Sequence, residues 1–169
     1  MYTIDDLDTV TELPDIPQSC TGAPCPLILC GDSFLHLAYF LDEPIQDWGG
    51  SPCLVGEGTP GRLCALVRFK FPASHSFGSP GDECVPGHPL AKRGLQHYSV
   101  SEVNNSSWIR ALAHLNEGHP RRSAKPYAGY RHFIFAFHDN VFECVAKGFE
   151  LSTHRGSVSD VLRASWPGH

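Results

Sequence analysis

The strongest constraint on the fold is the stretch over residues 130–149, YRHFIFAFHDNVFECVAKGF. In its first half, phenylalanine occupies every second position, and histidine, isoleucine and alanine occupy the positions between. Side chains of an extended strand point alternately to opposite faces, so this period of two predicts strand rather than helix. Asp139 and Asn140 tolerate positive φ, which predicts a two-residue turn and therefore a hairpin.

The two faces of this predicted hairpin differ in character. One face is apolar and needs a covering element: Phe133, Phe135, Phe137, Phe142, Cys144 and Ala146. The opposite face is mixed and carries His132, His138 and Glu143. With the turn at residues 139–140, Glu143 lies opposite Ala136 and diagonal to His138, within reach of a long side chain. The mixed face is therefore either the wet rim of a sheet or half of a site.

The composition describes a globular chain of one domain. With 169 residues, the chain is long enough to bury a substantial core. Charged residues make up 18% and hydrophobic residues 41%, while 16 Gly and 14 Pro predict many turns and few long helices. The net charge of −5 gives no electrostatic reason to expect nucleic acid or an anionic membrane as a partner.

The beginning of the chain and its cysteines bear on cellular location. The acidic start MYTIDDLDTVTE lacks the basic and then apolar layout of a secretory signal, and no run of the sequence is apolar enough for a membrane span. Seven cysteines leave at least one free thiol, and no two of them form a CxxC pair. These features favour a reducing compartment, so we expect a soluble cytoplasmic protein.

The chain divides into an arm and a domain. Residues 1–26 are acidic and interrupted by four prolines, which predicts an irregular N-terminal arm before a single domain over residues 27–169. Apolar or alternating runs predict further strands in the domain, over residues 27–30, 33–41, 62–71 and 96–103.

Two helices complete the predicted fold. Apolar residues repeat at helical spacing over residues 107–117, and Gly118 and Pro120 then end the helix. A capping pattern that begins at Ser157 predicts a short C-terminal helix that ends near Ser165. The expected fold class is α+β: a mainly antiparallel sheet of about five to seven strands, with the 107–117 helix packed on the phenylalanine face.

The segment over residues 72–94 has no helical or strand period for more than twenty residues. Long irregular segments within a compact domain are uncommon, and they often carry function. This segment holds apolar residues that can fix it in place, together with polar residues suited to chemistry, among them His75, Asp82, His88, Lys92 and Arg93. We therefore expect it to form part of a site.

A metal centre is one interpretation of these residues. The sequence contains no P-loop, no dinucleotide fingerprint, no HExxH and no GxSxG motif, so candidate chemistry rests on its ten histidines. A zinc or iron site uses two or three imidazoles, often with a carboxylate. The residues that could supply these groups are His75, Asp82, His88, His132 and His138. The alternative is that these side chains cap turns or lie at the wet margin of the sheet.

A second interpretation needs no metal. His138 beside Glu143 forms a general acid and base pair, because a carboxylate can orient an imidazole for proton transfer. His88 from the 72–94 segment is a third candidate catalytic residue. Cys144 is not expected to act as a nucleophile, since its position on the apolar face would destabilise a thiolate.

A third interpretation is anion recognition. Lys92, Arg93 and Arg121 lie in short basic clusters flanked by glycine and proline, and such clusters can hold a phosphate or a carboxylate of a substrate. The alternative is that they are solvated loop residues.

Two functions of different classes follow. The first is a small enzyme of the hydrolase or lyase type that acts on a polar small molecule, with its pocket between the 72–94 loop and the 130–149 hairpin. The second is a noncatalytic binding protein, such as an immunity, antitoxin or regulatory module. In that case the acidic arm would engage a basic protein partner.

Overall fold

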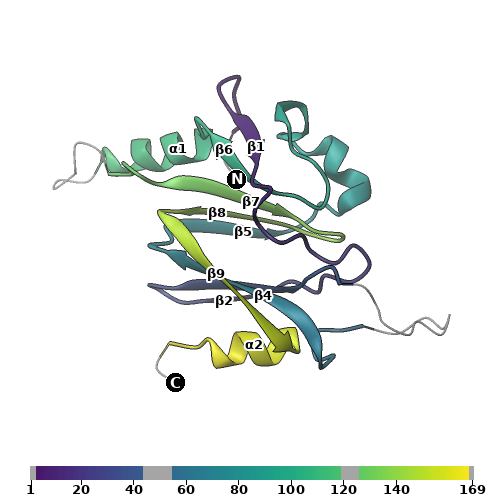
Figure 1. Cartoon of the computed structure of the whole chain (residues 1–169). Helices are drawn as coiled ribbons and strands as arrows, with labels where there is room; N and C mark the ends of the chain where they lie inside the picture. The colour runs from purple at the N-terminus through teal and green to yellow at the C-terminus, as the bar shows by residue number, and fades with distance from the viewer. Residues whose placement is uncertain (1–2, 44–54, 119–125, 168–169) are drawn as a thin grey trace.

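The computed structural model describes residues 3–43, 55–118 and 126–167. Figure 1 shows four layers: helix α1 and two short helical turns, a first sheet, a second sheet, and helix α2 on the far side. Every strand pairing is antiparallel. No helix within the described ranges combines the length and apolar character that a membrane crossing requires.

The first sheet has five strands in the order β1-β6-β7-β8-β5. Its strands are β1 (Thr9–Glu12), β5 (Ser74–Gly78), β6 (Val100–Asn104), β7 (Arg131–Ala136) and β8 (Val141–Ala146). The predicted hairpin is β7 and β8, and it lies inside this sheet with β6 and β5 on its two sides. Strands β1 and β5 form the edges, so the hairpin backbone is paired along both flanks.

The second sheet has four strands in the order β2-β3-β4-β9. Its strands are β2 (Leu27–Cys30), β3 (Leu35–Phe40), β4 (Arg62–Lys70) and β9 (Gly148–Gly156). Strand β9 follows the hairpin directly in the chain, yet it pairs with β4 in the other sheet. The chain therefore passes between the sheets over a single short connection.

The helices begin and end where the sequence predicts. Helix α1 spans Ser107–Asn116, and the Ser106 hydroxyl accepts a hydrogen bond from the Ile109 N–H at 3.3 Å. Helix α2 spans Val158–Ala164 and is capped in the same way by Ser157. Both predicted helices are thus confirmed. Two 3₁₀ turns, η1 (Asp82–Gly87) and η2 (Ala91–Arg93), lie within the segment that was expected to be irregular.

The phenylalanine face is covered by the second sheet and not by the helix. Phe133, Phe135 and Phe142 are fully buried against Tyr39 and Phe69 of the opposite sheet. Helix α1 instead lies on the outer face, where Trp108 meets His132 edge-on at 5.1 Å between ring centroids. The predicted cover was therefore wrong: two apolar sheet faces pack on each other, and each helix covers an outer face.

The hairpin register is shifted by two residues from the prediction. Ala136 pairs with Val141, and Ile134 pairs with Glu143, so the turn lies at His138 and Asp139. Phe137 closes it by donating its N–H to the Asn140 carbonyl at 2.8 Å. A shift of two keeps every side chain on its predicted face but changes each cross-strand neighbour. The diagonal neighbour of Glu143 is consequently His132 rather than His138.

The strand count also differs from the prediction. The antiparallel α+β class is confirmed, but the described residues form nine strands in two sheets instead of one sheet of five to seven. Three strands were not foreseen, and the first is β1, which lies within the arm expected to be irregular. Strand β5 lies within the segment expected to be irregular, and β9 lies after the hairpin, where Phe149 and Leu151 alternate with Glu150 and Ser152.

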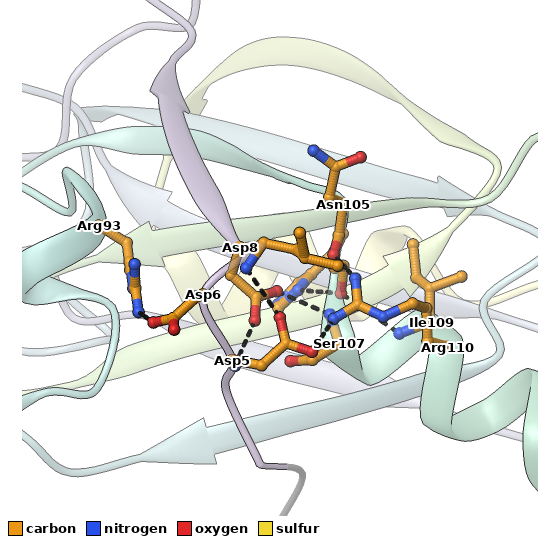
Figure 2. A network of polar contacts seen from close by, with 11 residues as sticks. Asp5, Asp6, Asp8, Arg93, Asn105, Ser107, Ile109 and Arg110 are labelled. Carbon is orange, nitrogen blue, oxygen red and sulfur yellow. Dashed lines mark hydrogen bonds and ion pairs between the residues drawn. The ribbon is translucent and has the colours of Figure 1, made fainter.

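The acidic arm is tied into the first sheet. Its strand β1 pairs with β6. Figure 2 shows the three aspartates before this strand directed at neighbouring groups of the same chain. Asp5 is bonded to Arg110 and Asp6 to Arg93, and the fully buried Asp8 accepts the Ser107 N–H at 2.7 Å. A carboxylate at the N-terminus of α1 also complements the helix dipole. The buried Asp8 thus serves the fold itself, whereas the Asp5 and Asp6 ion pairs lie at the surface.

Candidate functional site

A chain of polar side chains is buried on the outer face of the first sheet. His132 Nε2 lies 2.9 Å from Glu143 Oε2, and His132 Nδ1 lies 2.9 Å from the Ser106 hydroxyl. His132 is fully buried, while Ser106 and Glu143 are nearly so. Burying a polar group costs free energy unless the group is hydrogen-bonded, and each of these three side chains has a partner. The order of contacts is Ser106, His132, Glu143.

The elements of the fold place these three residues together. His132 and Glu143 are diagonal neighbours on strands β7 and β8, and both point to the outer face. Ser106 is the N-cap of α1, so the beginning of the helix lies over the sheet at this point. Trp108, from the first turn of α1, packs edge-on against the His132 ring. One helix cap therefore fixes both the helix and the imidazole.

Both ring nitrogens of His132 have hydrogen-bond partners. The ionised Glu143 accepts only, so His132 Nε2 carries a hydrogen toward it. At the other nitrogen, the Ser106 hydroxyl can donate to a neutral ring or accept from a protonated one, because a hydroxyl does both. Its oxygen also accepts the Ile109 N–H.

His88 lies at the outer end of this chain, just after η1. Its Nε2 is 3.7 Å from Glu143 Oε1, and its Nδ1 accepts the Leu90 N–H at 3.2 Å. A backbone N–H can only donate, so Nδ1 carries no hydrogen while this bond holds. The hydrogen of the neutral ring is therefore on Nε2, which faces the carboxylate. Nε2 is therefore the ring nitrogen of His88 that can donate to a group in this region.

A cavity of about 830 Å³ opens beside Glu143 and His88. It lies between η1, the edge strand β5 and helix α1. One wall is polar and includes Ser74, Ser76 and Cys84, and the other is apolar and comes mainly from α1: Trp108, Ala111, Leu112 and Leu115, with Ile4 from the arm. His75 also borders the cavity from β5, but its ring stacks on Phe142 on the inner face of the sheet. The volume falls within the usual range of small-molecule sites, about 300–1,000 Å³.

His138 belongs to a second polar cluster at the hairpin turn. Its Nδ1 lies 3.0 Å from Asp82 Oδ2 and 2.8 Å from the Tyr98 hydroxyl, and Tyr98 donates to Asp82. The Asp82 N–H also bonds the His138 carbonyl at 2.7 Å. The predicted pairing of His138 with Glu143 is therefore wrong. The cluster instead fastens the beginning of η1 to the hairpin.

The Tyr98–Asp82 bond predicts a stability change at alkaline pH. This bond raises the pKa of Tyr98 to about 12 and lowers the pKa of Asp82. An unfolded tyrosine ionises near pH 10. The contribution of the neutral phenol is thus fully present below about pH 10 and is lost as pH rises toward 12. In urea unfolding at pH 8–11, we expect Tyr98→Phe to flatten the alkaline decline. An unchanged decline would contradict the bond.

Lys92 and Arg93, the described members of the predicted anion-binding set, do not line the cavity. Arg93 is bonded to Asp6 of the arm, and Lys92 is exposed on η2. Neither is among the described residues that line the cavity. Arg121 lies outside the described residues.

The predicted metal ligands fall in two places. His75 and His88 line the cavity, with His132 behind Glu143, whereas Asp82 and His138 bond each other at the turn. Among the side chains that the structure describes, no group of three or more His, Cys, Asp or Glu is placed to hold a metal ion. The zinc or iron site stays a prediction.

Two residues of the site were missed in the sequence. Neither Ser106 nor Trp108 was among the predicted site residues, because a helix cap and an apolar helix position are ordinary features of a fold. The signal that could have found them is the cap itself, because a hydroxyl at a helix N-terminus lies close to whatever that terminus covers. Comparisons with protein-family models, with curated proteins and with solved structures found no match for this chain.

Proposed function

We propose that the cavity is the active site of a small enzyme of the hydrolase or lyase type. In this proposal Glu143 accepts a proton from the substrate or from water, and His88 donates a hydrogen bond from Nε2 to the reacting group. The observation that supports it is the buried chain from Ser106 through His132 to Glu143, which ends at the cavity. Hydrogen-bonded His and Glu side chains at the wall of a cavity are candidates for acid–base chemistry.

These residues account for every proton that moves in a hydrolysis. Glu143 Oε1 takes a proton from a water molecule as the water oxygen bonds to the carbonyl carbon of the substrate. The His88 N–H supports the negative charge that develops on the carbonyl oxygen. Glu143 then returns the proton to the leaving group as the bond to that group breaks. His132 holds the carboxylate in place and is a positioning residue.

The test compares turnover by matched variants. Neutral esters, neutral amides and hydroxy compounds that can lose water form the substrate panel. Glu143→Gln keeps the shape of the side chain but removes the base, and we expect it to lower kcat/KM by about 10²-fold or more. His88→Gln should also lower it. His154→Ala, on the second sheet, is the control and should not change it. Equal turnover by wild type and Glu143→Gln would refute the proposal.

Metal analysis belongs to the same experiment. The protein should be purified without a histidine tag and analysed for zinc and iron. A stoichiometric metal that is lost in His88→Gln would assign the predicted metal to this cavity. Metal content that does not change in His88→Gln would refute a zinc or iron site at this cavity.

The alternative, a binding module whose acidic arm engages a basic partner, draws less support from the structure. The expectation of a basic partner rested on the negative charge of the arm. Asp5, Asp6 and Asp8 are bonded to groups of the same chain, and Asp8 is fully buried. A basic partner would have to compete with Arg110 and Arg93 for the first two carboxylates.

A further inference from the structure

The charge inside the cavity points to the kind of molecule that fits it. Among the described lining residues, the carboxylate of Glu143 is the only carboxylate, and no lysine or arginine lines the cavity. An anionic ligand would bring a second negative charge close to Glu143, and the described lining residues supply no lysine or arginine to offset it. A hydrogen-bond donor or a cation at the same place would be favoured.

The polar wall places donors and acceptors around this carboxylate. Ser76 on the edge strand β5 lies directly opposite Glu143 on β8, so both side chains share the outer face. His88 Nε2 is 3.7 Å from Glu143 Oε1. A polar group that enters here can bond the carboxylate, the serine hydroxyl and the imidazole at once.

The apolar wall lies on the other side of the cavity. Trp108 and Leu112 of α1 form it, and Leu115, one turn further along, has 76% of its surface exposed at the rim. Ile4 of the arm adds to the same surface. An exposed leucine that lines a cavity gains free energy when an apolar group covers it. The ligand should therefore have an apolar part of comparable size.

We infer that the cavity binds a small amphipathic molecule that is neutral or cationic, with a hydrogen-bond donor at Glu143 and an apolar body on the α1 wall. This inference rests on the proposed function, since it names the substrate class of the same cavity. It differs from the expectation of an anionic substrate held by lysine and arginine, of which Lys92 and Arg93 do not line the cavity.

Three probes that differ mainly in charge test the inference: 2-phenylethylamine, 2-phenylethanol and 3-phenylpropionate. Their affinities are measured by calorimetry, and the indole N–H signal of Trp108 reports whether they bind in the cavity. We expect the amine to bind about tenfold or more tightly than the carboxylate. Glu143→Gln should reduce the preference for the amine over the alcohol by about tenfold.

Leu115→Ser provides the second variant. Its side chain is exposed, so the fold should be retained, and it should weaken the amine and the alcohol to the same extent. His154→Ala is again the control and should change neither affinity. Any of three results would overturn the inference. The carboxylate binds most tightly, the order of the three affinities is the same in Glu143→Gln, or the amine shows no saturable binding.

The outcomes separate this inference from the proposed function. If the amine binds in a manner that depends on Glu143 but turnover survives Glu143→Gln and His88→Gln, the catalytic proposal fails and the ligand class stands. If turnover depends on both residues but the carboxylate binds most tightly, the ligand class fails and the catalytic proposal stands.

Discussion

Replacing His132 by alanine is expected to destabilise the protein by about 3–5 kcal/mol. The ring is fully buried, and it bonds both Glu143 and Ser106 at 2.9 Å. Its removal leaves the buried carboxylate without its closest imidazole and opens a cavity beside Trp108. Urea unfolding at neutral pH, followed by circular dichroism, measures the change in the free energy of unfolding.

His138→Ala is the matched control, because it removes the same ring from the same hairpin. The His138 side chain is 40% exposed and bonds Asp82 at the turn. We expect a loss below about 1 kcal/mol, as is usual for partly exposed polar contacts. If His138→Ala costs as much as His132→Ala, then the register that joins His132 to Glu143 is contradicted.

Phe135→Ala is expected to have a loss of similar size, about 3–5 kcal/mol. Phe135 lies at the centre of the core between the sheets and is fully buried. Its ring packs against rings from both sheets: Tyr39, Phe69, Phe137, Phe142 and Phe149. A core filled by interlocking rings cannot close around the missing one. Urea unfolding measures the loss.

Phe71→Ala tests whether burial, and not the loss of any aromatic ring, is responsible. Phe71 is 67% exposed, and its main contact is with Lys147, whose Nζ lies 4.8 Å from the ring centroid. We expect a loss below about 1 kcal/mol. Equal losses in the two variants would contradict the placement of the phenylalanine face between the sheets.

The faces of the hairpin could be predicted from the sequence, but its register could not. Alternation fixes which side chains share a face, because the period of a strand is two. Register depends on where the turn falls, and the residue types favoured 139–140 over the observed turn at His138 and Asp139. A shift of two leaves the alternation unchanged. The sequence pattern therefore could not distinguish His132 from His138 as the partner of Glu143.

The second sheet explains why the cover of the phenylalanine face was misjudged. An apolar sheet face can be buried by a helix or by another sheet, and local patterns do not say which. The strands that cover it, β3 and β4, were each predicted, but they were expected to extend the same sheet. Strands β3 and β4 belong to a separate sheet, in which β4 pairs with β9, a strand that was not foreseen.

The candidate site was predicted in its parts but not in its assembly. His88, Glu143 and the 72–94 segment do meet at one cavity, together with His75. The buried partners, His132 and Ser106, could be assigned only once the register and the position of α1 were known. Arg93 was misjudged because its partner, Asp6, comes from the arm, far away in the sequence.

The most direct measurement is the change that Glu143→Gln causes in the ¹⁵N chemical shifts of the histidine ring nitrogens. Long-range ¹H–¹⁵N correlation spectra of the wild type and the variant measure it. The central claim is that Glu143 joins His132 and His88 at the cavity. The ring nitrogens of His132 and His88 should then shift, whereas those of His138 should not, because His138 bonds Asp82. Shifts at His138 with unchanged signals at His132 would contradict the account.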